Sequence, residues 1–144
     1  MTDVLAVIGA AWIMTIGATQ TSGQAVPATR SVWDGVYSAD QATRGKEQYT
    51  THCSMCHIAD LRGDGMAPGL VGDDFMLQWS DLSANDLFTR TRNSMPQDNP
   101  RSLADDVYLD ILTYVFQANK FPAGNEDLKA DATTLKAIKV EKRK

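Results

Sequence analysis

The chain has 144 residues, of which 43% are hydrophobic and 22% charged, and a formal net charge of −4 at pH 7. These values describe one ordinary globular domain. The charge is uneven: residues 26–135 carry 9 basic and 16 acidic side chains, whereas residues 136–144 carry 5 basic and 1 acidic. An acidic body argues against nucleic-acid binding, because proteins of that class present a basic face to phosphates.

The N-terminal segment is apolar from Val4 to Ala18 and contains no charged residue over that run. A run of this length is short for a membrane span, which needs about 20 residues, but suits the apolar core of a signal peptide. Small residues follow, so we expect a signal peptide over residues 1–25 and a mature chain that begins near Val26. Met-Thr-Asp at the start lacks Lys and Arg, which is unusual for a signal peptide. An uncleaved N-terminal anchor is the alternative. Both readings place the remaining chain across a membrane, and we expect it in the periplasm.

The first helix should begin after residues 26–37, which read as an extended lead-in. Ser38, with Gln41 three residues later, matches a capping box. The helix that follows carries the sequence HCSMCH, residues 52–57, at its C-terminal end.

Beyond this segment, residues 59–74 are rich in Gly and Asp and predict a loop, followed by a short helix at Phe75–Trp79. Ser83, with Asp86, caps a helix over residues 84–93. This helix should end before Met95-Pro96, because a proline biases the preceding residue toward an extended conformation.

The best-marked helix spans residues 103–119, and Ser102 with Asp105 should cap it. Its polar residues form a narrow stripe, so we expect most of its circumference to be covered; they are Asp105, Asp106, Asp110, Thr113 and Gln117. A C-terminal extension, residues 120–144, should hold a short helix around residues 132–138. Its basic tail either docks on an acidic partner or membrane surface or is a solvated terminus. The whole pattern predicts an all-α fold of three to five helices.

The segment HCSMCH contains every cysteine and histidine of the chain. A structural zinc site needs a second, separate pair of ligands, which is missing. A thioredoxin-like pair follows a parallel strand, which the pattern does not show. A disulfide between residues three apart closes too small a loop to stabilise much. The favoured chemistry of C-x-x-C-H is therefore covalent attachment of one haem c through Cys53 and Cys56, with a lone redox or metal-binding pair as the alternative.

The iron needs two axial ligands from the chain. His57 lies on the same helical turn as the cysteines and is the expected proximal ligand. His52 is tethered on the attachment side and cannot easily reach the opposite face. For the sixth position we expect Met95, because its Pro-punctuated loop between two capped helices can cross the far face of the porphyrin. Met66, Met76 or an open position are the alternatives.

With these residues in place, the chain resembles the class I c-type cytochromes over roughly residues 36–118. The matching segments are CSMCH at 53–57, APGL at 67–70, SMP at 94–96 and YLDILTYVF at 108–116. The resemblance implies a small cytochrome c fold in which the Pro68 carbonyl accepts a hydrogen bond from Nδ1 of His57. It also implies that the first helix, at Gly45 and Tyr49, crosses the last near Ile111 and Tyr114. Three further residues are candidates for bonds to the haem propionates: Trp79, Arg90 and Arg92.

A haem with both axial positions filled does not bind substrate easily, so we expect single-electron transfer and not catalysis. The alternatives are an open-site haem sensor or enzyme, and a fixed haem subunit of a larger membrane oxidoreductase complex. The flanking segments at 31–45 and 117–128 resemble cytochrome c subunits or partners of quinoprotein (PQQ-dependent) alcohol and sugar dehydrogenases. That resemblance implies such a dehydrogenase as electron donor and a terminal oxidase or another cytochrome as acceptor, with membrane contact through the N-terminus.

Overall fold

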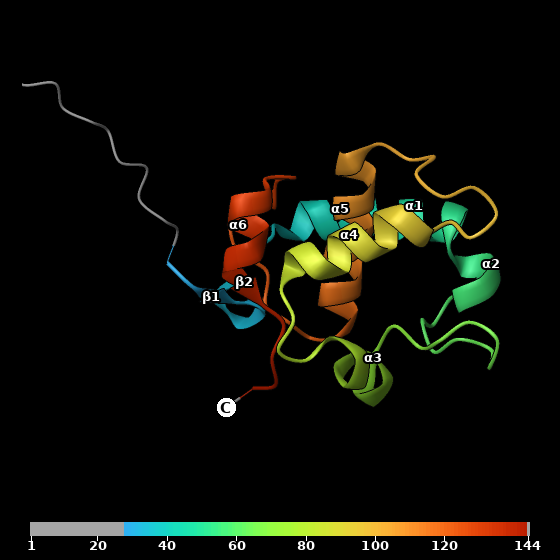
Figure 1. Ribbon diagram of the computed structural model, residues 1–144, viewed down its shortest axis with the longest axis horizontal. Coiled ribbons are helices and arrows are strands. Elements are labelled where there is room, and N and C mark those ends of the chain that lie inside the picture. The colour runs from blue at the N-terminus through green and yellow to red at the C-terminus, as the bar shows by residue number, and fades with distance from the viewer. Residues whose placement is uncertain (1–27, 144) are drawn as a thin grey trace, which may run out of the picture.

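The computed structural model describes residues 28–143, so the segment expected to be a signal peptide or anchor lies outside the described residues. The described chain is mostly helical, which confirms the all-α prediction (Figure 1). It holds six α-helices, where three to five were expected; two of the six, α2 and α6, are very short. They are α1 (Ala39–His52), α2 (Ser54–His57), α3 (Gly72–Trp79), α4 (Ala84–Ser94), α5 (Asp105–Ala118) and α6 (Ala132–Ala137). No helix within residues 28–143 is long and apolar enough to cross a membrane.

Helices α1 and α5 cross at very close range, as the family resemblance implies. A Cβ atom built on Gly45 would lie 1.8 Å from the main-chain oxygen of Asp110 and 3.1 Å from Cβ of Tyr114. Only a residue without a side chain allows the two backbones to approach this closely. One turn further along α1, the rings of Tyr49 and Tyr114 lie with their centroids 5.4 Å apart. The tightest contact is at Asp110, so the crossing lies near Ile111 and Tyr114, where the resemblance places it.

Helix α5 forms the centre of the core. Seven of its residues are buried: Tyr108, Leu109, Ile111, Leu112, Thr113, Val115 and Phe116. The prediction that protein covers most of its circumference is confirmed. One detail is wrong, because Thr113 was assigned to the polar stripe but is fully buried. Its hydroxyl donates to the main-chain oxygen of Asp110 at 2.8 Å, which satisfies the polar group inside the core.

Side-chain caps begin some helices as predicted and not others. The box at α4 is complete, because the Ser83 hydroxyl accepts from the N–H of Asp86 and the Asp86 carboxylate accepts from the N–H of Ser83. At α1, Ser38 caps the helix, but the side chain of Gln41 is buried and pairs with both main-chain groups of Leu128. The predicted cap of α5 by Ser102 is wrong: the helix begins after Ala104, with no side-chain cap.

The N-terminal and C-terminal parts of the described chain pack against each other at one end of the molecule. Strand β1 (Arg30–Ser31) pairs in parallel with β2 (Ile138–Lys139), and a 3-10 turn at Val32–Asp34 follows β1. The phenol of Tyr37, which is fully buried, donates to the main-chain oxygen of Phe121. Val32, Val36 and Tyr37 are thus part of the core, and this segment is more than an extended lead-in. The start of the basic tail is also folded, because Ile138 and Val140 are fully buried.

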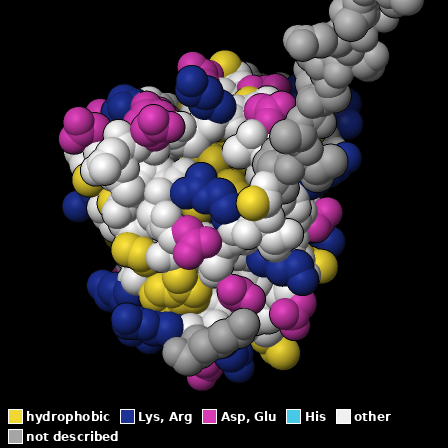
Figure 2. Space-filling view, turned by 90° about the vertical axis from the view of Figure 1, so that its left-hand side faces the viewer, with side chains coloured by type: hydrophobic (Ala, Val, Ile, Leu, Met, Phe, Trp, Pro, Cys, Tyr) yellow, Lys and Arg dark blue, Asp and Glu magenta, His cyan; other side chains and the backbone are white. Residues whose placement is uncertain are grey.

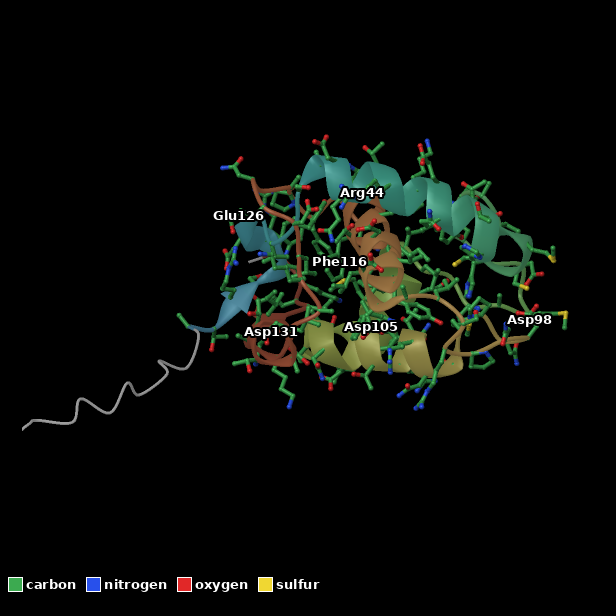
Figure 3. The ribbon with its side chains drawn as sticks, turned by 90° about the horizontal axis from the view of Figure 1, so that it is seen from above. Arg44, Asp98, Asp105, Phe116, Glu126 and Asp131 are labelled. Carbon is green, nitrogen blue, oxygen red and sulfur yellow. The ribbon has the colours of Figure 1, made fainter. Side chains whose placement is uncertain are left out.

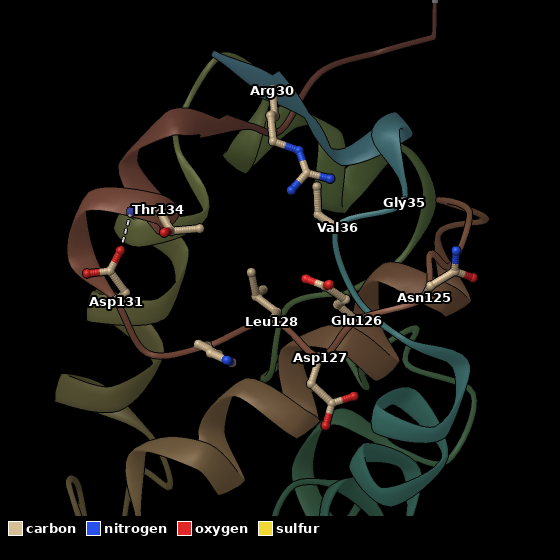
Figure 4. A pocket seen from close by; sticks show the side chains of 10 residues that line it. Arg30, Gly35, Val36, Asn125, Glu126, Asp127, Leu128, Asp131 and Thr134 are labelled. Carbon is tan, nitrogen blue, oxygen red and sulfur yellow. Dashed lines mark hydrogen bonds between the residues drawn. The ribbon is translucent and has the colours of Figure 1, made fainter. Parts of the chain in front are cut away.

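This end of the molecule also contains a hollow of about 420 Å³ between Val36, Leu128 and α6 (Figure 4). Two carboxylates on its rim already have partners: Asp127 binds Arg44 at 2.7 Å, and Asp131 accepts from the N–H of Thr134 at the start of α6. Figure 2 shows the same end, where acidic and basic side chains are interspersed around a few apolar ones. The visible described residues there present no extended patch of one charge.

Candidate functional site

The Cys-His segment lies at the end of the molecule opposite α6 (Figure 1). Helix α1 ends at His52, and Cys53 breaks the helix before α2 begins. The prediction that the whole segment continues the first helix is therefore wrong. The N–H groups of Cys56 and His57 both donate to the main-chain oxygen of Cys53, at 3.2 and 3.0 Å, which closes a tight turn. Both cysteines are free thiols, Cys53 half-buried and Cys56 exposed. Burial raises the pKa of the Cys53 thiol to about 11.

His57 is buried, with 7% of its surface exposed. Its Nδ1 lies 2.9 Å from the main-chain oxygen of Pro68, so the contact implied by the family resemblance is present. A carbonyl oxygen can only accept, so Nδ1 must carry the proton and donate it. In the neutral tautomer with its proton on Nδ1, the lone pair of Nε2 is free, as an imidazole needs in order to bind a metal.

The Pro68 carbonyl is held in place by a tightly folded loop. Gly63 has a positive φ of 73°, and a Cβ atom there would lie 2.2 Å from the main-chain oxygen of Ala67 and 2.9 Å from the carbonyl carbon of Pro68. The Asp64 carboxylate accepts from the N–H groups of Ala67 and Met66, both at 2.9 Å, and these bonds lower its pKa. The Gly- and Asp-rich composition of this segment therefore serves turns that position a carbonyl.

A second set of contacts fixes the two ends of this loop. At its start, the phenol of Tyr49 donates to the main-chain oxygen of Ile58 at 2.6 Å. Burial raises the pKa of this phenol, so it stays protonated and donates. At its end, the side chain of Asn119 donates to the oxygen of Leu70 and accepts from the N–H of Gly72, both at 2.9 Å. Sequence patterns gave no signal for either contact, because each joins residues from different elements.

Met95 is the C-terminal cap of α4, as predicted from the proline that follows it. Its N–H donates to the main-chain oxygen of Thr91 at 2.8 Å, and its own oxygen accepts from the phenol of Tyr108 at 2.7 Å. Asp98, in the same loop, lies at one end of the molecule, whereas Glu126 and Asp131 lie at the other (Figure 3). The methionine loop therefore shares an end of the molecule with the Cys-His segment (Figure 1).

The two other candidate methionines are presented differently. Met66 is 94% exposed in the loop that follows His57. Met76 lies in α3 and packs against the hydrophobic core. Met76 and Met95 are both half-buried, but among the described hydrogen bonds of these three methionines only the Met95 carbonyl accepts from the side chain of another helix, the phenol of Tyr108.

The three propionate candidates lie on α3 and α4. Trp79 is buried at the end of α3, and Arg90 is exposed on α4. Arg92 forms an ion pair with Asp105 at the start of α5. No hydrogen bond joins these three side chains to the Cys-His segment within residues 28–143.

The donor set fits a covalently attached haem. Two free thiols three residues apart precede a histidine whose Nδ1 is occupied and whose Nε2 is available, and an all-α fold surrounds them. This combination defines a c-type cytochrome. Residues 40–115 match the model of the family described as "Cytochrome C oxidase, cbb3-type, subunit III", and because the match covers more than half of the chain, the chain belongs to that family. No curated protein and no solved structure matches the chain.

Membership fixes the general chemistry. A cytochrome c domain implies covalently bound haem c, electron transfer and redox partners.

Proposed function

We propose that this protein is a mono-haem c-type cytochrome that carries single electrons in the periplasm. Cys53 and Cys56 hold the haem through thioethers, and Nε2 of His57 binds its iron. The observation that carries this proposal is the 2.9 Å contact between Nδ1 of His57 and the Pro68 oxygen, because it fixes both the tautomer and the plane of the ring. When bound, haem supplies an iron that exchanges one electron at a time.

Met95 is the sixth ligand in this proposal. Its place at the end of α4, held by Thr91 and Tyr108, supports the assignment. A thioether ligand favours the ferrous state and raises the reduction potential relative to a second histidine. With His57 and Met95 both on the iron, the chain leaves no position for a substrate, which favours electron transfer over an enzyme or a sensor with an open site.

The donor we propose is a quinoprotein dehydrogenase that oxidises an alcohol or a sugar, and the acceptor is a terminal oxidase or another cytochrome. The sequence resemblance at 31–45 and 117–128 supports the donor. These two flanking segments also pack together, through Tyr37 with Phe121 and Gln41 with Leu128, so they act as one structural unit. Met55 lies within the Cys-His segment and Met66 in the loop that follows it; each is 94% exposed, and exposed methionines make adaptable apolar contacts.

A second candidate is a fixed haem subunit of an oxidoreductase complex. The description of the matching family, which names an oxidase subunit, favours it. The site chemistry is the same in both cases, and the difference is whether the chain diffuses between partners.

Covalent attachment is tested by acid-acetone extraction of protein matured in a cell with c-type assembly machinery. Thioethers survive the treatment and coordination bonds do not, so haem should stay with the protein. Replacement of both cysteines by serine should make the haem extractable. Loss of haem from the wild-type protein would disprove attachment.

The sixth ligand is tested by comparing Met95→Ala with Met66→Ala as a matched control. Met95→Ala should turn the six-coordinate low-spin ferric spectrum into that of an open site, lower the reduction potential and allow carbon monoxide to bind the ferrous form. Met66→Ala should leave all three unchanged. The reverse pattern would move the ligand role to Met66.

The donor is tested by mixing reduced dehydrogenase with ferric cytochrome and following haem reduction at several ionic strengths. Haem reduction should be fast, and its rate should fall as salt is added, because redox proteins meet through small interfaces and their association is electrostatically steered. A cytochrome that reduced dehydrogenases leave ferric, but that a quinol-oxidising complex reduces rapidly, would be a general respiratory shuttle. Stable co-purification with membrane subunits would favour the fixed subunit.

A further inference from the structure

Three buried tyrosines of the core make the same kind of hydrogen bond. Tyr37, Tyr49 and Tyr108 are each at most 1% exposed, and each donates its phenol hydrogen to a main-chain oxygen. The acceptors are Phe121 at 2.6 Å, Ile58 at 2.6 Å and Met95 at 2.7 Å, respectively. The first bond joins the two flanking segments. The second holds Ile58, the residue after His57, and the third holds Met95.

The Met95 carbonyl accepts no hydrogen bond from its own helix, α4. The last carbonyls of an α-helix lack intrahelical partners. Met95 is the C-terminal cap of α4, and the proline after it brings no N–H group. The phenol of Tyr108, which comes from the first turns of α5, therefore ties the end of one helix to another helix at this residue.

A second contact strengthens the same junction. Arg92, in the last turn of α4, pairs with Asp105, and Asp105 lies three residues before Tyr108 on α5. Residues three apart share a helix face, so one face of α5 holds the end of α4 at two points. Arg101 closes the loop in turn, since its N–H donates to the main-chain oxygen of Arg92 at 3.2 Å.

The two axial ligands differ in how they depend on such contacts. In the proposed function, His57 is tethered to the porphyrin by thioethers of residues one and four positions earlier. Met95 has no covalent tether, so only the protein holds its sulfur over the iron. Two carbons separate that sulfur from Cα, and a shift of the backbone therefore moves the sulfur directly.

We propose that Tyr108 is a positioning residue for Met95: its phenol fixes the Met95 carbonyl and so keeps the thioether sulfur on the haem iron. This inference rests on the proposed function, in which Met95 is the sixth ligand. Loss of the phenol hydroxyl leaves the Met95 carbonyl without this donor and favours an open state in which the sulfur has left the iron. Imidazole added to the ferric protein can bind the iron only in that open state.

The test compares Tyr108→Phe with Tyr37→Phe in the haem-loaded protein. Both residues are at most 1% exposed, and both variants lose one phenol hydroxyl that is bonded to a main-chain oxygen. Tyr37 precedes the start of α1, a helix of about 21 Å, and the Cys-His segment follows its end. Tyr37→Phe should therefore lower thermal stability without changing the iron site.

Tyr108→Phe should bind imidazole about tenfold more tightly in the ferric state and should have a lower reduction potential. Equal imidazole affinity and potential in the two variants would overturn the proposal and leave Tyr108 as a packing residue.

Met95→Ala separates this outcome from a failure of the proposed function. If Met95→Ala opens the site and Tyr108→Phe does not, only the role of Tyr108 is refuted. If Met95→Ala also leaves imidazole affinity and spectrum unchanged, Met95 is not a ligand, and both the ligand assignment and the role of Tyr108 fail.

Discussion

Replacement of Gly45 by alanine would test the helix crossing on which the site is built. The new Cβ atom would lie 1.8 Å from the oxygen and 2.4 Å from the carbonyl carbon of Asp110. Real Cβ atoms essentially never come closer than 3.0 Å to such atoms, so α1 and α5 would have to separate by at least about 1.2 Å at this point. Helix α1 leads to the Cys-His segment, and α5 carries Tyr108, which binds the Met95 oxygen. Separation of the two helices would therefore disturb the supports of both His57 and Met95.

The expected magnitude follows from two opposing effects. Alanine is favoured over glycine by about 1 kcal/mol in a helix interior. Overpacking of a core typically costs about 1–3 kcal/mol, and the upper end applies here because main-chain atoms cannot rotate away as side chains can. We expect Gly45→Ala to lower the free energy of unfolding by about 2 kcal/mol, with a fall in melting temperature on the order of 10 °C.

The assay is guanidinium unfolding of the haem-loaded protein, followed by far-UV circular dichroism. Lys46, which is exposed in the same turn, supplies the control through Lys46→Gly and Lys46→Ala. At position 46 the alanine variant should be more stable than the glycine variant by about 1 kcal/mol. At position 45 the order should be reversed. A Gly45→Ala protein as stable as the wild type, or more so, would refute the close contact.

Two further predictions concern the loop after His57 and the cap of α4. Gly63→Ala should displace the Pro68 carbonyl, because the new Cβ atom would meet Ala67 at 2.2 Å, and histidine ring NMR should show a weaker Nδ1–H bond; an unchanged ring signal would contradict this. Hydrogen bonds from the Ser83 side chain and N–H lower the pKa of Asp86, so the charged carboxylate stabilises the fold above the unfolded-state pKa of about 3.9, and this stability is lost as pH falls through the folded-state pKa. Asp86→Asn should therefore be less stable than the wild type at pH 7 and closer to it at pH 3 in unfolding experiments, and a gap that stays constant would count against the reasoning.

The sequence by itself determined the chemistry of the attachment segment and much of the helical pattern. Cys53, Cys56 and His57 lie within five consecutive residues, so their spacing can be recognised without any tertiary contact. The start of α4 at Ser83 and its end at Met95 follow from local rules, because a capping box and a proline act on their immediate neighbours. The close crossing at Gly45 was accessible only through resemblance to a known family.

The tertiary structure decided which polar groups are buried and what they bind. Gln41 pairs with Leu128, although the sequence pattern assigns it to a capping box with Ser38. Thr113 is buried, although its helical position assigns it to a polar stripe. Tyr108 reads as part of an apolar face, yet its hydroxyl reaches Met95 on another helix. Such contacts depend on where two elements meet, since the cost of burying a polar group is met only by a partner that packing brings within reach. For this protein the chain positions of the proposed iron ligands were set locally, and the hydrogen bonds that hold them were set by the fold.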